Sequence, residues 1–240
     1  MKKFAPLLLL FLLAFTACRK NDDAPPAAEC RTATMIVNTA AATSVYSFSY
    51  NSDGKMGRVV NDNNVITFDY GADGYVATFS SSGKMYKQTT VKIDAQQRPA
   101  SAAVKHYAAD GTFDPEAITC TYNSRGELVQ QVSQKKGLPA ETTSTVWVNG
   151  NCTVISNNAQ SQTMEYYADK PVQQADIFRI NQLLLHGFVN VFNKNLAKSM
   201  KSGASVIQFT YEFDAAGRIT TATLTTGGQS EARSFQYDCD

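Results

Sequence analysis

The chain has 240 residues, and its 22 basic and 21 acidic side chains nearly cancel, which leaves a formal charge of +1 at pH 7. A near-neutral chain lacks the concentrated positive charge that nucleic-acid binding requires, so we expect no nucleic-acid partner. The length suits one large domain, and frequent Thr, Ser, Tyr and Val are typical of strands with one face in water.

The first 17 residues read as a secretory signal peptide. Lys2 and Lys3 precede an apolar run over residues 4–15, which is shorter than the roughly 20 residues of a membrane-spanning helix. Residues 15–18, Phe-Thr-Ala-Cys, resemble the lipobox of bacterial lipoproteins, in which the Cys is acylated and becomes the new amino terminus. We therefore expect Cys18 to be lipidated; the alternative is an ordinary signal peptide with a chance Cys.

Residues 18–29 predict a flexible linker between the lipid and the domain. The segment is polar, contains Pro25 and Pro26, and has no apolar periodicity. Two or three acyl chains hold a protein stably on a bilayer, so the chain would be anchored in the membrane without spanning it. Asp22 and Asp23 resemble the signal that sends some lipoproteins to the cell surface. The expected location is the outer membrane, facing outward or, alternatively, the periplasm.

A short turn recurs along residues 30–240, which we interpret as a single β-rich domain. An aromatic residue is followed four positions later by Gly, and the residue two after the Gly is apolar. Gly at the end of such a loop suits a type I turn with a left-handed residue, which joins two antiparallel strands. The predicted turn glycines are Gly54, Gly74, Gly111, Gly126 and Gly217. This repeat predicts a scaffold and not an active site.

Alternating apolar and polar residues predict half-buried antiparallel strands between the turns. Tyr46, Phe48 and Tyr50 share one face, for example, and Asn149-Gly150 is the strongest hairpin signal in the chain. The predicted strands cover residues 46–50, 66–70, 75–80, 85–94, 100–107, 116–122, 128–135, 142–149, 152–157, 164–167, 206–213, 219–225 and 232–239.

The apolar period becomes helical over about residues 173–200. Ile177, Ile180, Leu184 and Phe188 follow helical spacing, so we expect one helix, or two broken near Gly187. The segment is too apolar to lie on a surface, so it should pack on the sheet or plug a partly closed barrel. The expected fold is mainly β: a large curved antiparallel sheet or incomplete β-barrel, arranged as a meander, with this helical segment on or inside it.

Four cysteines remain once Cys18 is assigned to lipid. Exported proteins occupy an oxidising compartment where disulfides persist. We favour pairing Cys30 with Cys239, which would tie the two ends of the domain together, and Cys120 with Cys152 by elimination. The alternative, that Cys120 and Cys152 are buried free thiols, is nearly as well supported.

No catalytic or metal-binding motif occurs in the sequence, and we expect no enzyme, no metal and no cofactor. His186 is most simply a partly buried helical residue, and His106 a strand residue facing water. Asp69 to Gly74 has carboxylates spaced somewhat like a calcium loop, but Gly71 supplies no side-chain ligand, so a plain turn is the simpler interpretation.

Several of these segments together resemble known families. The Tyr-x-x-x-Gly turns resemble the YD repeats of large bacterial surface proteins. A second resemblance, to a lipoprotein family of unknown function described as having a porin-like fold, implies a curved antiparallel sheet and an outer-membrane lipoprotein, and implies no reaction. It rests on the order of residues 147–151 (Trp-Val-Asn-Gly-Asn), 193–196 (Asn-Lys-Asn-Leu), 213–217 and the closing Tyr237-Asp238-Cys239.

The sequence therefore predicts a surface-anchored, non-catalytic binding or scaffold module of the outer membrane. Its partners would be the membrane, through the lipid, and a glycan, protein or lipid ligand that the sequence does not identify. One alternative is a carrier of lipophilic cargo, because an incomplete barrel covered by an apolar helix can hold acyl chains. A weaker alternative is a polysaccharide hydrolase, which would need two carboxylates facing each other in a polar cleft.

Overall fold

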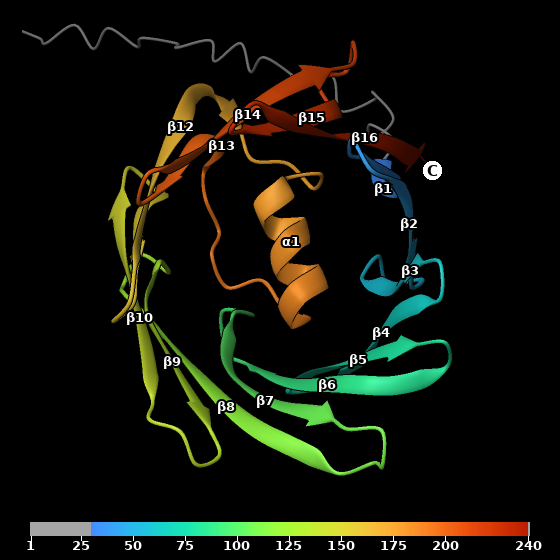
Figure 1. Ribbon diagram of the computed structural model, residues 1–240, viewed down its shortest axis with the longest axis vertical. Helices are drawn as coiled ribbons and strands as arrows, with labels where there is room; N and C mark the ends of the chain where they lie inside the picture. The colour runs from blue at the N-terminus through green and yellow to red at the C-terminus, as the bar shows by residue number, and fades with distance from the viewer. Residues whose placement is uncertain (1–29, 240) are drawn as a thin grey trace, which may run out of the picture.

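The computed structural model describes residues 30–239, which form one closed antiparallel β-barrel of 16 strands. Each strand pairs with the next along the chain, and the last pairs with the first. The strands are β1 (Cys30–Asn38), β2 (Thr43–Tyr50), β3 (Met56–Asn61), β4 (Asn64–Gly71), β5 (Gly74–Ser81), β6 (Lys84–Ile93), β7 (Pro99–Tyr107), β8 (Phe113–Tyr122), β9 (Leu128–Lys135), β10 (Glu141–Val148), β11 (Asn151–Ser156), β12 (Ser161–Pro171), β13 (Asn195–Ser202), β14 (Ser205–Phe213), β15 (Ile219–Thr226) and β16 (Gln229–Cys239). Figure 1 shows the one helix of this region, α1 (Ile177–His186), enclosed by the ring of strands.

The predicted β-rich meander with a helix is confirmed. The prediction that the sheet is open or the barrel incomplete is wrong, because the barrel is closed. Closure depends on β1, which the sequence analysis did not predict as a strand. β1 pairs along its length with β16, from Cys30 opposite Cys239 to Asn38 opposite Ala232. A closed barrel leaves no strand edge unpaired, which removes the main route to edge-to-edge aggregation.

The predicted helix over residues 173–200 is also too long. α1 ends at His186, and Gly187 follows in the left-handed conformation with φ of 80°. Residues 195–202, expected at the end of the helix, form β13 instead. Between them, residues 187–194 run without regular structure through the interior of the barrel; we call this stretch the return segment.

Four of the five predicted turn glycines end a turn of the expected kind. Gly54, Gly111, Gly126 and Gly217 have φ between 79° and 84°, and each donates its N–H to the carbonyl three residues earlier. Gly74 does not belong with them: it faces Gly71 across a two-residue hairpin. Its φ of 149° and the backbone of β6 both exclude a side chain, because a Cβ would lie 1.9 Å from the Val91 carbonyl oxygen.

Tyrosines fasten one end of the barrel. Each of five tyrosine hydroxyls donates to a backbone carbonyl on the strand that precedes its own. The pairs are Tyr50 with Thr32, Tyr70 with Met56, Tyr122 with Pro99, Tyr166 with Cys152 and Tyr237 with Ile219, at 2.6 to 3.0 Å. Because successive turns of a meander alternate between ends, all five bonds lie at the end that also carries residues 30 and 239. We call this end the tyrosine rim, and it gives the aromatic residue of the repeat a structural role.

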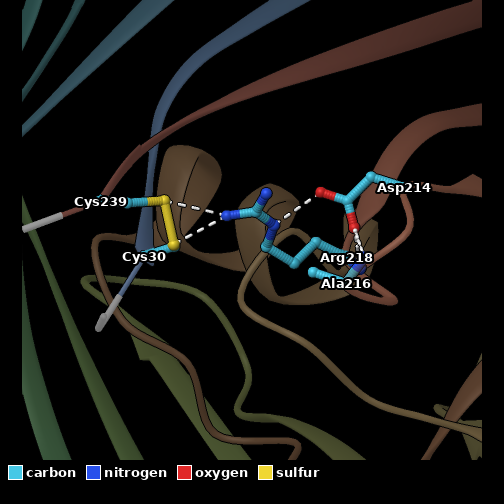
Figure 2. Close-up of a disulfide and its surroundings, with 5 residues drawn as sticks. All are labelled: Cys30, Asp214, Ala216, Arg218 and Cys239. Carbon is cyan, nitrogen blue, oxygen red and sulfur yellow. Dashed lines mark hydrogen bonds and ion pairs between the residues drawn. A yellow bond between two sulfur atoms is a disulfide. The ribbon is translucent and has the colours of Figure 1, made fainter. Parts of the chain in front are cut away.

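The predicted disulfide between Cys30 and Cys239 is confirmed and closes the seam at the tyrosine rim. Figure 2 shows Arg218 beside it, with Nη1 donating to both sulfurs and Nε donating to Asp214 Oδ2 at 2.7 Å. The pairing of Cys120 with Cys152 is wrong, because both are free thiols. They lie on β8 and β11, three strand spacings of about 4.8 Å apart along the sheet, too far for a disulfide.

The signal peptide, Cys18 and the linker to residue 29 lie outside the described residues, so their predictions stand as made. Within residues 30–239, no helix has the length and apolar character needed to cross a membrane.

Candidate functional site

The interior of the barrel is mainly apolar, and its outer surface is largely polar. On β14, Phe209 and Tyr211 point inward to α1, while Gln208, Thr210 and Glu212 alternate with them and are exposed. On β15, Ala222 and Leu224 follow this alternation on the inside, and a register shift next to Ile219 places that residue inside as well. The same alternation places further polar residues outside, including Thr67, Thr78, Ser80, Thr90, Thr119, Thr121, Thr221, Thr223 and Thr225. Valines are the main apolar exceptions on the outer surface, among them Val45, Val146, Val148 and Val206.

Helix α1 fills part of the interior and begins and ends at well-defined caps. Asp176 precedes it in an extended conformation, and its side chain accepts a hydrogen bond from the Arg179 backbone N–H. At the other end, Gly187 N–H donates to the Leu183 carbonyl. Ile177 and Ile180 are buried against β1–β5 and β13–β16 in the largest hydrophobic cluster.

Polar contacts fix the orientation of α1 relative to the wall. Just before the helix, Gln173 donates to the Gly217 carbonyl and accepts from the Ile219 N–H. In the middle of the helix, Asn181 accepts from Arg233 of β16 at 2.7 Å. At the last turn, Lys87 of β6 donates to the Leu185 carbonyl, where a cation also meets the negative end of the helix dipole. Burial lowers the pKa of Lys87 to about 8.

The return segment depends on side-chain partners because it lacks a helical backbone ladder. Gln182 Oε1 of α1 accepts from the backbone N–H groups of Asn190 and Val191, at 3.0 and 3.3 Å. Asn190 donates to Gln131 of β9, and Asn193 accepts from the Cys152 N–H. Asn190 and Asn193 are therefore buried polar residues with structural functions.

A polar cluster lies on β7–β9, toward the end opposite the tyrosine rim. Glu116 accepts hydrogen bonds from Ser133 at 2.6 Å, and its other oxygen lies 3.2 Å from His106 Nε2. These bonds lower the pKa of Glu116 against the opposing effect of partial burial. The serine bonds the carboxylate and not the histidine, so the three residues do not have the arrangement of a nucleophile with its base.

A cavity of about 210 Å³ lies between α1 and the wall formed by β1, β2 and the start of β3. Its lining combines buried residues, such as Phe48 and Ile180, with one exposed residue, Gln174. The lining residues are Thr32, Phe48, Tyr50, Met56, Gln174, Arg179, Ile180, Leu183 and Val189. Most of this lining is apolar, and Arg179 contributes the only charged side chain. No motif in the sequence marks these residues as a site, although the apolar stripe of α1 predicts that the helix packs against the sheet.

The sequence-predicted histidines and the calcium-like stretch do not converge on this cavity. His186 ends α1, with its ring 5.9 Å from that of Phe188, and His106 is exposed beside Glu116. Asp69 to Gly74 form the end of β4 and its hairpin. Among residues 30–239, no three His, Cys, Asp or Glu side chains come together as metal ligands would.

Comparisons with known proteins identify the fold. A porin-like protein from Bacteroides uniformis has a crystal structure that matches with a TM-score of 0.65 at 10% sequence identity, over 86% of this chain and 98% of that one. A porin-like protein from Bacteroides vulgatus matches with a TM-score of 0.45 at 11% identity, over 88% and 99% of the two chains. No family model matches the sequence, and no curated protein matches it. The first of these two matches identifies the fold of the barrel as porin-like.

Proposed function

We propose that this chain is a non-catalytic binding module of the cell envelope, anchored in the outer membrane by lipid on Cys18 with its barrel standing in water. The observation that carries the proposal is the distribution of polarity: apolar side chains and α1 fill the interior, and Thr, Ser and Gln dominate the outside. Barrels that span outer membranes have the reverse distribution, with an apolar band facing lipid and a polar lumen.

The filled interior also argues for binding rather than conduction. Barrels of 16 to 18 strands in porins leave an aqueous channel. Here α1 and the return segment occupy that space, and both contribute buried apolar residues to the core, such as Ile180 and Val191. A barrel with this interior offers surfaces and small cavities to a ligand instead of a continuous water-filled path.

A carrier of lipophilic cargo is the second candidate, and the cavity beside α1 favours it. A void under the helix is what a carrier needs, whereas a scaffold would be filled throughout. The hydrolase alternative gains no comparable support. Two of the five cavities have a single carboxylate in their lining, Asp238 in one and Glu127 in the other. The other three have none.

Membrane fractionation of Cys18→Ser tests the proposal. With the acylated residue removed and a water-compatible barrel surface, the variant should move from the membrane pellet to the soluble fraction. Cys120→Ser, which removes a free thiol inside the barrel, is the matched control and should stay with the membrane. Continued sedimentation of Cys18→Ser with membranes, resistant to carbonate washing, would show that the barrel itself enters the bilayer.

A further inference from the structure

We propose that the cavity between α1 and β1–β3 binds a small amphipathic monocarboxylate, with the carboxylate on Arg179 and the apolar chain against Phe48, Ile180 and Leu183. The inference rests on the proposed function, because it supplies the ligand class of the binding module. It deepens that function by naming both the position of the ligand and the residue that selects its charge.

Arg179 is the first reason for an anionic ligand. Its side chain is half-buried in the first turn of α1, and within residues 30–239 it forms no side-chain hydrogen bond or ion pair. The neighbouring carboxyl of Asp176 acts on it electrostatically but bonds its backbone N–H, which leaves the guanidinium donors open. Guanidinium is always charged in proteins, and its planar donors match a carboxylate in a bidentate pair.

Thr32 is the second, independent reason. Its side chain is 3% exposed in the cavity wall, and its Oγ1 has no hydrogen-bond partner. A buried hydroxyl without a partner costs free energy, so such groups are rare and mark places where another atom belongs. Rotation about χ1 moves its hydroxyl to another staggered position, which lets Thr32 donate to an oxygen placed in the cavity.

The remaining lining sets the size and polarity of the rest of the ligand. Phe48, Ile180 and Leu183 present hydrocarbon, which rules against a sugar or nucleotide in this cavity. About 210 Å³ is less than the roughly 300 to 1,000 Å³ of sites for drug-sized ligands. A single short chain fits this volume, and a two-chain phospholipid does not. Octanoate is therefore a suitable probe, with octan-1-ol as its neutral and octylamine as its cationic counterpart.

The test is calorimetric titration of the full-length Cys18→Ser chain, which carries no acyl groups of its own, with each of the three probes below its micelle concentration. Octanoate should bind, octan-1-ol should bind at least about tenfold more weakly, and octylamine should not bind. Only octanoate has the carboxylate that accepts a charged hydrogen bond from Arg179, and the cation of octylamine would be repelled. Equal binding of octanoate and octan-1-ol, or no binding of octanoate, would overturn the inference.

Variants assign the binding to this cavity. Arg179→Gln removes the charge but leaves a polar side chain, and it should weaken octanoate about tenfold or more while leaving octan-1-ol unchanged. Arg58→Gln, on the exposed outer surface of β3, is the matched control and should bind octanoate as the parent does. Thr32→Val should weaken octanoate by a smaller factor, and Leu183→Trp should block both probes. Unchanged octanoate affinity in both Arg179→Gln and Leu183→Trp, each with an unaltered melting temperature, would contradict the assignment.

The two proposals fail in different experiments. If Cys18→Ser is released from membranes but octanoate does not bind, the ligand class is wrong and the lipid-anchored module stands. If octanoate binds but Cys18→Ser remains in the membrane, the cavity is real and the anchoring is wrong.

Discussion

Helix α1 and the return segment occupy the same apolar barrel but satisfy their backbones in different ways. α1 bonds most of its N–H groups within its own backbone, and side chains supply backbone partners only at its ends, where Asp176 accepts from the Arg179 N–H and Lys87 donates to the Leu185 carbonyl. The return segment has no internal ladder of backbone hydrogen bonds. Gln182 therefore accepts from two of its backbone N–H groups, and the side chain of Asn193 fixes the segment to the Cys152 N–H of β11. A helix therefore enters an apolar interior with few polar side chains, whereas an irregular segment must bury polar side chains that bond its backbone or fix it to the wall.

The junction between the two regions should be the most sensitive position. Gly187 has φ of 80°, and a Cβ there would lie 2.7 Å from Ala77 Cβ. Gly187→Val should lower the free energy of unfolding by about 3 to 5 kcal/mol, because backbone strain adds to overpacking. Gly111→Val meets the same strain, with φ of 84° and no atom within 4 Å, and should cost only about 1 to 2 kcal/mol. Urea unfolding measures both; equal losses would contradict the close packing at Gly187.

The helix cap should make stability depend on pH. Burial raises the pKa of Asp176 to about 6, above its unfolded value near 3.9. The folded state therefore binds the proton more tightly, and this residue's contribution to stability falls as pH rises from about 4 to about 6 and is constant above that. Ionised Asp176 should cost about 2 to 3 kcal/mol at neutral pH.

Asp176→Asn isolates that effect, because Asn keeps the capping oxygen without the charge. The difference in unfolding free energy between the two chains, measured by urea unfolding from pH 4 to pH 8, should widen in favour of the variant across this window. A difference that does not change with pH would show that Asp176 ionises at its ordinary pKa.

The link between the two regions should have an intermediate effect. Gln182→Leu leaves the N–H groups of Asn190 and Val191 without their acceptor, which should cost about 2 kcal/mol. Gln208→Leu, exposed on the outer surface of β14, is the control and should change the unfolding free energy by less than about 0.5 kcal/mol. If the two variants have the same stability, the return segment does not depend on Gln182.

Removing either of two tyrosine hydroxyls should change the free energy of unfolding by the smallest amount, with opposite signs at the two positions. Tyr211, in the cluster that packs on α1, has a buried hydroxyl without a hydrogen-bond partner. Tyr166, packed near Val191 of the return segment, donates to the Cys152 carbonyl at 2.6 Å. Tyr211→Phe should raise the free energy of unfolding by about 1 kcal/mol, and Tyr166→Phe should lower it by about 1 kcal/mol. Thermal melting of both variants checks the signs, and two changes of the same sign would refute the comparison.

The sequence predicted the strands and turns well because their signals are local. Alternation of apolar and polar residues identified β2, β4 and β14. The aromatic-x-x-x-Gly spacing located the turns that end at Gly54, Gly111, Gly126 and Gly217. The turn at Asp94–Arg98 escaped because Gln97, with φ of 61°, takes the position of the Gly. Nothing in this local pattern distinguishes it from a loop of another kind.

Features that depend on distant partners could not be predicted in the same way. Barrel closure requires β1 to meet β16, and only the suspected bridge between Cys30 and Cys239 hinted at it. The helix was drawn too long because Phe188 and Val191 continue its apolar period, yet inside a barrel apolar residues are buried in every direction. The cavity at Arg179 arises from three strands and a helix far apart in the chain, so no motif announced it.

Native-state hydrogen exchange of α1 tests most directly whether the helix is a permanent part of the core. The Ile180 and Gly187 amides donate within the helix, to Asp176 and Leu183. If α1 is fixed inside the barrel, these amides should exchange only through global unfolding, with the same protection as amides of the paired strand β15. Exchange of the α1 amides within seconds, while β15 stays protected, would show that the helix leaves the interior and that the barrel is an openable channel.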